Sequence, residues 1–126
     1  MARILIFEDE SDIAELYRME LVDRGHEVLG IYADPQEVLE PAEGLHLVLD
    51  PEVILLDERL GSLSGMKYLR RLRQAFRSAR IFMVSADPEA LERGRSGGAD
   101  EIAQKPVPVH RLADTVDSML TRPTVR

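Results

Sequence analysis

The chain has 126 residues, close to the usual size of one domain, and is long enough to bury a substantial core. Hydrophobic residues make up 44% and charged residues 31% of it, a balance typical of globular rather than disordered proteins. The net charge of −7 argues against nucleic-acid binding as the main function, and the absence of cysteine excludes disulfides and zinc-thiolate sites.

The first apolar run, residues 3–7, is short and uninterrupted, which predicts a strand that is buried on both faces. Apolar residues between positions 13 and 21 then recur at helical spacing, so a helix is expected to follow this strand. Ser11 or Asp12 is a suitable N-cap for the helix. Gly25 is a suitable end point, because glycine readily adopts the left-handed conformation found at helix ends.

Residues 26–32 predict a second strand. Asp34-Pro35 then opens a second helix, since it places a capping residue before a proline at the first helical position. Pro41 and Gly44 interrupt this helix, and residues 45–49 are compatible with either its last turn or an extended piece.

The second half of the chain continues the same alternation of strands and helices. Strands are predicted at residues 53–56, 81–84 and 101–104. Helices are predicted from Met66 to Phe76 with Ser64 as the cap, from Pro88 to Arg95 with Gly97-Gly98 as the end, and from Val109 to Leu120.

The alternation of strands and helices places the chain in the α/β class. It predicts a five-stranded parallel doubly wound sheet, a flavodoxin-like (βα)5 fold with strand order 2-1-3-4-5. We expect residues 1–121 to form one domain and residues 122–126 to be a frayed tail. In such folds ligands bind outside the carboxyl ends of the strands, near the point where the strand order reverses.

Polar side chains follow four of the predicted strands at that edge. Glu8 and Asp9 follow the first strand, Asp57 the third, Ser85 the fourth and Lys105 the fifth. Three carboxylates so close together repel one another, so either one is protonated or a cation is bound. Oxygen ligands with open positions suit Mg²⁺. A lysine and a hydroxyl opposite them could clamp a phosphoryl group that is being transferred.

The same segments resemble the receiver domains of bacterial response regulators, and the resemblance covers essentially the whole chain. Four motifs carry it, in the order and at the strand ends that the family has. They are the acidic pair Glu8-Asp9, the stretch from Asp57 to Gly65, Ser85-Ala86, and Gly98-Ala99-Asp100 followed by Lys105-Pro106.

The resemblance implies that Asp57 is the nucleophile that accepts a phosphoryl group from a histidine kinase or a phosphotransfer protein. It also implies that Asp9 and Asp57 bind Mg²⁺ through their side chains. Glu8 would act directly or through a water, and the backbone carbonyl of Arg59 would be a further ligand. The chain would then be a phosphoryl-accepting switch of a two-component system, and not an enzyme in the ordinary sense.

The family also assigns roles around the phosphoryl group. Lys105 would pair with its oxygens, Ser85 would hydrogen-bond one of them, and the small Ala86 would leave room for it. Pro106 follows the lysine, and in this family that peptide bond is usually cis. Ile102 stands where the family usually has an aromatic switch residue, and an isoleucine cannot make the same ring movement.

Two further departures concern loops. Gly61 stands where the family usually has proline, so we expect a more flexible loop after Asp57. The segment from Asp34 to Asp57 is a few residues longer than usual and contains Pro41, which is either a partner-specific surface or a harmless bulge.

The expected partners follow from the same resemblance. They are the phosphodonor protein and a downstream protein that the sequence does not identify, whereas neither nucleic acid nor a membrane is expected to bind this domain. We expect a monomer or a phosphorylation-linked dimer in the cytoplasm, either as a single-domain regulator or as the receiver part of a longer protein.

Other interpretations remain at the sequence level. Glu8-Asp9 could merely favour the start of a helix, Asp57 could be a turn residue, Ser85 a loop hydroxyl and Lys105 an exposed lysine. A degenerate receiver that binds partners without phosphorylation would explain Ile102. A phosphatase with an aspartyl-phosphate intermediate is disfavoured, because such enzymes carry a second aspartate where this chain has Arg59.

Two sets of residues have simpler interpretations. The basic stretch that contains Arg70, Arg71, Arg73, Arg77 and Arg80 lacks interleaved aromatic residues, so it is interpreted as the solvated face of a helix, with docking of an acidic partner as the alternative. The three histidines, His26, His46 and His110, have no metal-ligand spacing and are expected at the surface or at helix ends.

Overall fold

The computed structural model describes residues 1–40, 44 and 48–122, and these form a five-stranded parallel sheet with helices on both faces. The strands of the sheet are β1 (Arg3–Phe7), β2 (Glu27–Tyr32), β3 (Val53–Asp57), β6 (Arg80–Ser85) and β7 (Glu101–Gln104). Their order across the sheet is β2-β1-β3-β6-β7, and all four neighbouring pairs are parallel. The predicted fold class and strand order are therefore confirmed.

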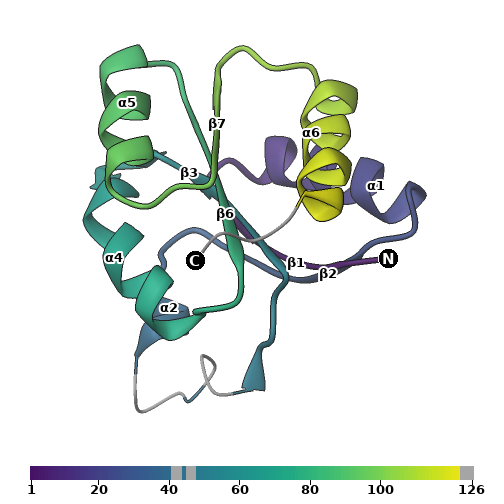
Figure 1. Ribbon diagram of the computed structural model, residues 1–126, viewed down its shortest axis with the longest axis horizontal. Coiled ribbons are helices and arrows are strands. Elements are labelled where there is room, and N and C mark those ends of the chain that lie inside the picture. The colour runs from purple at the N-terminus through teal and green to yellow at the C-terminus, as the bar shows by residue number, and fades with distance from the viewer. Residues whose placement is uncertain (41–43, 45–47, 123–126) are drawn as a thin grey trace.

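The helices divide between the two faces of the sheet (Figure 1). Helices α1 (Ser11–Asp23) and α6 (Val109–Thr121) contact each other on one face, and α2 (Gln36–Leu39), α4 (Met66–Ala75) and α5 (Pro88–Ser96) cover the other. Among the described residues, no helix is long and apolar enough to cross a membrane.

The sheet separates two hydrophobic clusters, because successive residues of a strand point to opposite faces. On β3, Ile54 packs in the cluster beneath α4, whereas Leu55 packs in the cluster beneath α1 and α6. Leu72 of α4 and Val116 of α6 are fully buried against these two faces. Burial on both faces explains why the central strands are continuous apolar runs.

The ends of α1 differ in part from the prediction. The residue before the helix is Glu10, and neither Ser11 nor Asp12 caps it, because Ser11 already lies in the first turn and no side-chain cap bond forms. The predicted end is confirmed, since Gly25 follows the last turn with a φ of 89°.

The segment after Asp57 forms a hairpin that was not predicted. Strands β4 (Arg59–Leu60) and β5 (Leu63–Ser64) pair antiparallel across a two-residue turn. Gly61 in this turn has a φ of 63°, which proline cannot adopt. Ser64 does not cap α4 as predicted: Gly65 is the N-cap residue, and the Ser64 hydroxyl instead hydrogen-bonds Glu58.

The second helix is shorter than its sequence pattern predicts. Asp34 accepts a hydrogen bond from the backbone N–H of Gln36 at 2.9 Å, but the N-cap residue is Pro35 rather than Asp34, and α2 ends after one turn at Leu39. The predicted break at Pro41, most of the piece at 45–49 and most of the predicted tail lie outside the described residues.

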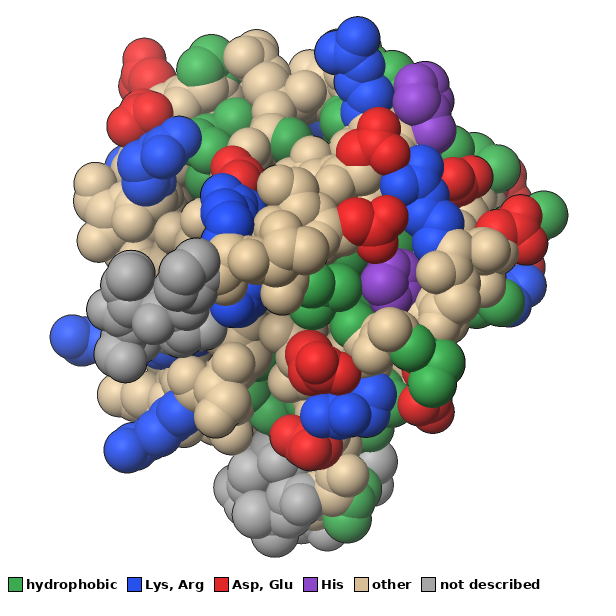
Figure 2. Space-filling view, turned by 45° about the vertical axis from the view of Figure 1, so that its right-hand side comes forward, with side chains coloured by type: hydrophobic (Ala, Val, Ile, Leu, Met, Phe, Trp, Pro, Cys, Tyr) green, Lys and Arg blue, Asp and Glu red, His purple; other side chains and the backbone are tan. Residues whose placement is uncertain are grey.

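The prediction for His26 holds only in part: this residue follows the end of α1, but its side chain is buried rather than at the surface. Its Nδ1 accepts a hydrogen bond from the backbone N–H of Ala2 at 3.1 Å, and its Nε2 lies 2.6 Å from a carboxylate oxygen of Asp117. Arg24 also binds Asp117, at 3.0 Å, and contacts Asp114. Acidic, basic and histidine side chains stand close together on this side of the molecule (Figure 2). His110 is exposed as expected, and His46 lies outside the described residues.

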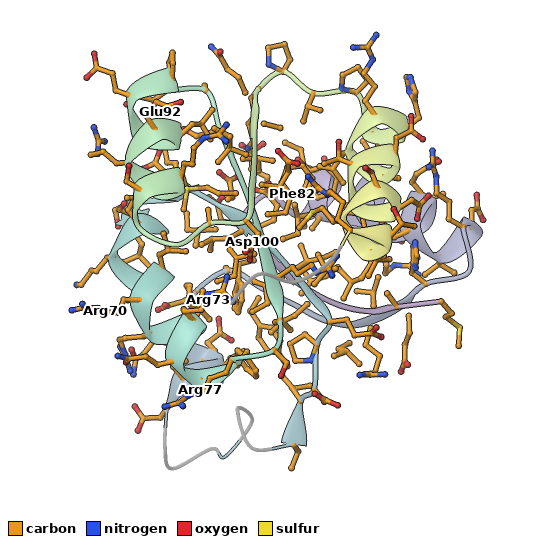
Figure 3. All side chains as sticks on the ribbon, viewed as in Figure 1. Arg70, Arg73, Arg77, Phe82, Glu92 and Asp100 are labelled. Atoms are coloured by element: carbon orange, nitrogen blue, oxygen red, sulfur yellow. The ribbon has the colours of Figure 1, made fainter. Side chains whose placement is uncertain are left out.

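The basic stretch is divided between solvent and internal contacts. Arg70 on α4 is exposed and points away from the helix in Figure 3, as a solvated helix face should, and Arg77, just after the helix, is exposed as well. Arg73 instead points toward Asp100 in Figure 3 and lies 2.6 Å from its carboxylate, while also donating to the carbonyl oxygens of Ala79 and Gly98. Arg73 therefore joins α4 to the start of β7.

Candidate functional site

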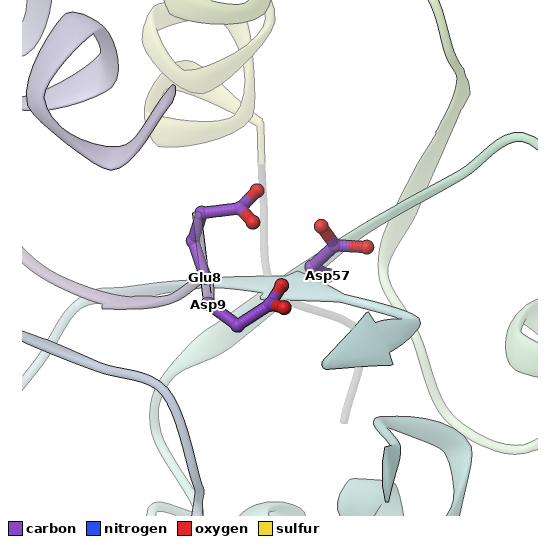
Figure 4. A group of neighbouring side chains, drawn as sticks. All are labelled: Glu8, Asp9 and Asp57. Atoms are coloured by element: carbon purple, nitrogen blue, oxygen red, sulfur yellow. The ribbon is translucent and has the colours of Figure 1, made fainter. Parts of the chain in front are cut away.

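Three carboxylates meet at the carboxyl ends of β1 and β3. Glu8 and Asp9 directly follow β1, and Asp57 is the last residue of β3. One oxygen from each lies within 4.8 Å of the other two, and the three groups face one small space (Figure 4). The site lies at the ends of β1 and β3, where the strand order of the sheet reverses. Ligands of open α/β sheets bind at this position.

Lys105 approaches this cluster from the end of β7. Its Nζ lies 2.6 Å from Oδ2 of Asp57 and 3.7 Å from Oε1 of Glu8. The backbone holds the lysine in place, because its N–H donates to the carbonyl oxygen of Ser85 at 2.9 Å. The structure therefore brings together the acidic residues and the lysine that the sequence placed at separate strand ends.

The backbone around Asp57 fixes the second oxygen of its carboxylate. The N–H of Arg59 donates to Oδ1 at 3.1 Å. Gly65 closes the hairpin against this segment, and a Cβ at that position would collide with the carbonyl oxygen of Asp57. A glycine at position 65 is thus required by the close approach of the two backbones.

Glu8 is buried in this cluster with few partners. Its Oε2 accepts a hydrogen bond from the N–H of Glu10 at 3.1 Å, but its Oε1 is buried without a hydrogen bond. Burial, followed by the close approach and negative charge of Asp57, raises the pKa of Glu8 to about 8. A protonated carboxyl or a bound cation would each relieve this repulsion.

Lys105 keeps its positive charge although its side chain is partly buried. Burial lowers the pKa of the lysine, but the hydrogen bond to Asp57 and the charges of Asp57 and Glu8 outweigh it, so the pKa is raised above its ordinary value. The ammonium group is therefore a permanent positive charge beside Asp57 at neutral pH.

Ser85 lies at the end of β6, but its hydroxyl is not directed at Asp57. Its Oγ donates to Oε1 of Glu58 at 3.0 Å and accepts from the N–H of Asp87 at 3.0 Å. Sequence reasoning did not single out Glu58. The only signal was an acidic residue directly after the buried strand that ends in Asp57.

These groups line an open cavity of about 350 Å³. Ala86 stands on its wall and is small enough to leave the space clear. Asp87 also lines it, but its carboxylate caps α5 by accepting from the N–H of Glu89 at 3.0 Å. The full lining is Asp9, Glu10, Asp57, Glu58, Arg59, Gly61, Ser85, Ala86, Asp87 and Lys105.

Two residues singled out from the sequence lie beside the cavity rather than in it. Ile102 is half-buried on β7, opposite Met83 of β6, and packs against the core beneath α4. Pro106 is exposed, and its peptide bond with Lys105 is cis.

Comparison with known proteins gives one consistent family. A family model for the response regulator receiver domain matches residues 4–117. The chain is 33% identical to the phosphate regulon transcriptional regulatory protein PhoB of Rhizobium meliloti over 97% of this chain and 53% of that protein. It is 30% identical to the response regulator ArlR of Staphylococcus aureus over 97% and 54%. The chain thus spans about half the length of these curated relatives.

Solved structures agree on the fold. The BeF3-activated receiver domain of DrrB superimposes with a TM-score of 0.76 at 22% identity, and the match covers 97% of this chain and 99% of that one. At this level of identity the likeness concerns the fold.

Proposed function

The chain belongs to the response regulator receiver domain family of two-component systems, and on that premise we propose that it is a phosphoryl-accepting switch with Asp57 as the acceptor. The observation that carries the proposal is the contact of 2.6 Å between Lys105 and Asp57, inside a cavity that two further carboxylates adjoin. We propose that residues 1–121 form the functional unit, because α6 ends at Thr121.

The arrangement suits attack by Asp57 on a phosphoryl donor. One carboxylate oxygen would form a bond to phosphorus while the phosphorus–nitrogen bond of a phosphohistidine breaks. The open cavity gives the donor access to the buried carboxylate. Lys105 would neutralise the negative charge that the phosphoryl oxygens bring, and its raised pKa supports a charged ammonium throughout.

The donor set fits a magnesium ion. Glu8, Asp9 and Asp57 offer hard oxygen ligands. The buried Oε1 of Glu8, which has no hydrogen bond, and the mutual repulsion of the cluster favour a cation there. We propose Asp9 and Asp57 as side-chain ligands, Glu8 as a direct or water-mediated one, and the backbone carbonyl of Arg59 as a further ligand. When bound, Mg²⁺ would neutralise charge on the phosphoryl oxygens.

Two other residues would complete the response to the phosphoryl group. Ser85 would donate a hydrogen bond to it, and Ala86 leaves space for it on the cavity wall. Ile102, beside Met83 on the sheet, would take the place of the usual aromatic residue in transmitting the structural response to phosphorylation to the surface. Pro106 would help to orient Lys105.

We propose that the phosphodonor is a histidine kinase or a phosphotransfer protein. A mostly apolar groove of about 530 Å³ adjoins the site between α1 and the segment after Lys105, where a donor protein could dock. Leu16 on this groove is 55% exposed. The downstream partner would be another protein, since the charge of −7 disfavours nucleic acid at this domain, and phosphorylation could also promote a dimer.

The test is incubation with acetyl phosphate and Mg²⁺, followed by intact-mass measurement. The wild-type chain should gain one phosphoryl group, and omission of Mg²⁺ or replacement of Asp57 by Asn should abolish the gain. A folded wild-type chain that never gains this mass would sink the proposal. The solved DrrB receiver domain is BeF3-activated, and we propose beryllofluoride as a phosphoryl mimic for this chain as well.

A second function is favoured by Ile102, which lacks the ring of the usual switch residue. In this alternative the chain is a degenerate receiver that binds its partner without phosphorylation. The affinity for a partner protein would then be the same for the wild type, the phosphorylated form and Asp57→Ala.

A further inference from the structure

Ser85 has its single hydroxyl proton committed to Glu58. The distance from its Oγ to Oε1 of Glu58 is 3.0 Å, and the same Oγ accepts the N–H of Asp87 at 3.0 Å. A serine hydroxyl has only one proton to donate. The side chain is 3% exposed, so water does not readily replace either partner.

Glu58 is well held in the position from which it binds this hydroxyl. Its backbone N–H donates to the carbonyl oxygen of Val84 at 2.9 Å, which anchors it to the end of β6. Its second carboxylate oxygen lies 3.4 Å from the hydroxyl of Ser64 on β5. Glu58 thereby connects the hairpin after Asp57 to the strand that carries Ser85.

A phosphoryl group on Asp57 would compete with Glu58 for that proton. The group presents strong acceptor oxygens, but a carboxylate is also a charged acceptor, and hydrogen bonds to charged acceptors are the stronger ones. Because the proton cannot be donated twice, Ser85 reaches the phosphoryl group only by leaving Glu58.

We infer that Glu58 is a positioning residue that holds the hydroxyl of Ser85 in its resting place and so opposes the switch to the phosphorylated form. This inference rests on the proposed function, since it takes Asp57 as the acceptor. Removal of the Glu58 side chain should make the site respond to lower concentrations of a phosphodonor or of a phosphoryl mimic.

The simplest competing explanation is electrostatic. Glu58 lines the same cavity as Asp57, so its charge alone would repel an incoming anion, whatever Ser85 does. The two explanations differ in whether the effect of Glu58 depends on Ser85. A double-mutant cycle between these residues therefore separates them.

The experiment titrates each protein with beryllofluoride in excess Mg²⁺ and follows the backbone amide signal of Asp87, whose N–H donates to Ser85. Glu58→Leu should lower the half-saturating concentration on the order of tenfold. In the Ser85→Ala background the same substitution should change it by less than about twofold. The Asp87 signal should also shift in Glu58→Leu before any beryllofluoride is added.

Two further variants serve as controls. Glu58→Gln removes the charge but keeps an oxygen that accepts from Ser85, so it should change the half-saturating concentration less than Glu58→Leu, and it remains a test if the leucine variant fails to fold. Glu10→Gln removes an equal charge from the cavity wall without touching Ser85, so its effect should stay below about threefold.

The outcomes test the role of Glu58 separately from the phosphoacceptor function of Asp57. If Glu58→Leu tightens binding equally with and without Ser85, or does not tighten it at all, the role of Glu58 is refuted and the phosphoacceptor proposal stands. If the folded wild-type protein binds no beryllofluoride with Mg²⁺ and gains no phosphoryl group, the proposed function is refuted and the role of Glu58 with it.

Discussion

Replacing Glu8 by Gln should stabilise the metal-free protein at neutral pH. The side chain is 1% exposed, and burial raises the pKa of Glu8 from 4.5 to about 8. A carboxyl whose pKa rises on folding binds its proton more tightly in the folded state. Its contribution to the free energy of unfolding is therefore fully present below pH 4.5 and is lost as the pH rises toward 8. A glutamine has no proton to retain and keeps an oxygen for the N–H of Glu10.

The size of the effect follows from the two pKa values. Each pH unit above the pKa of Glu8 in the unfolded state costs about 1.4 kcal/mol of stability, until the pH reaches the pKa in the folded state. At pH 7 the wild type should therefore be less stable than Glu8→Gln by on the order of 1 to 3 kcal/mol. At pH 4.5 the two proteins should differ by less than about 0.5 kcal/mol.

The assay is urea unfolding of both proteins in EDTA at several pH values between 4.5 and 8, repeated in excess Mg²⁺. In EDTA the gap should widen as the pH rises. Excess Mg²⁺ should narrow the stability gap between the two proteins. Mg²⁺ binds only the folded state, and it should stabilise the wild type, which keeps the carboxylate of Glu8, more than Glu8→Gln. Glu10→Gln, a substitution at the exposed neighbour, is the control and should leave stability nearly unchanged. A gap in EDTA that does not change with pH would refute the reasoning.

Three other predictions concern the neighbouring residues and the rest of the fold. Lys105→Met removes the ammonium that lies 2.6 Å from Asp57, so the initial rate of phosphoryl uptake should fall at least about tenfold by intact mass; an unchanged rate would contradict the role of the lysine. Gly65→Ala puts a methyl group against the carbonyl oxygen of Asp57, and urea unfolding should reveal a loss of about 2 kcal/mol or more, whereas wild-type stability would show that the contact can relax. Burial raises the pKa of Asp117, but hydrogen bonds from His26 and Arg24 outweigh it and lower the pKa below 3.8. Stability from this carboxylate is then present above pH 3.8 and lost in stronger acid, so Asp117→Asn should cost about 1 kcal/mol at pH 7 and almost nothing below its folded pKa; an equal cost at both pH values would point to packing instead.

The fold was predictable because its signals are local and repeated. Continuous apolar runs such as residues 53–56 identify strands buried on both faces, and the alternation with helices leaves few topologies for a parallel sheet. The site followed from the same reasoning. Once the strands are parallel, residues directly after them, such as Asp57 and Lys105, must meet at one edge.

The side-chain contacts at the site were not predictable in the same way. Ser64 looks like a helix cap in sequence, but its hydroxyl turns to Glu58, which also takes the hydroxyl of Ser85. His26 was expected at the surface or at a helix end, but its side chain is buried between Ala2 and Asp117, which lies 91 positions away in the chain. Such pairs depend on tertiary distances, and no periodicity or local motif encodes them.

The central claim is that a phosphoryl group is attached to the carboxylate of Asp57. Borohydride reduces an acyl phosphate of aspartate to homoserine, so treatment of the phosphorylated protein followed by peptide mass spectrometry identifies the modified position. We expect homoserine at position 57 in the wild type and no homoserine in Asp57→Asn. Reduction at another aspartate, or a phosphoryl group that withstands borohydride, would contradict the account.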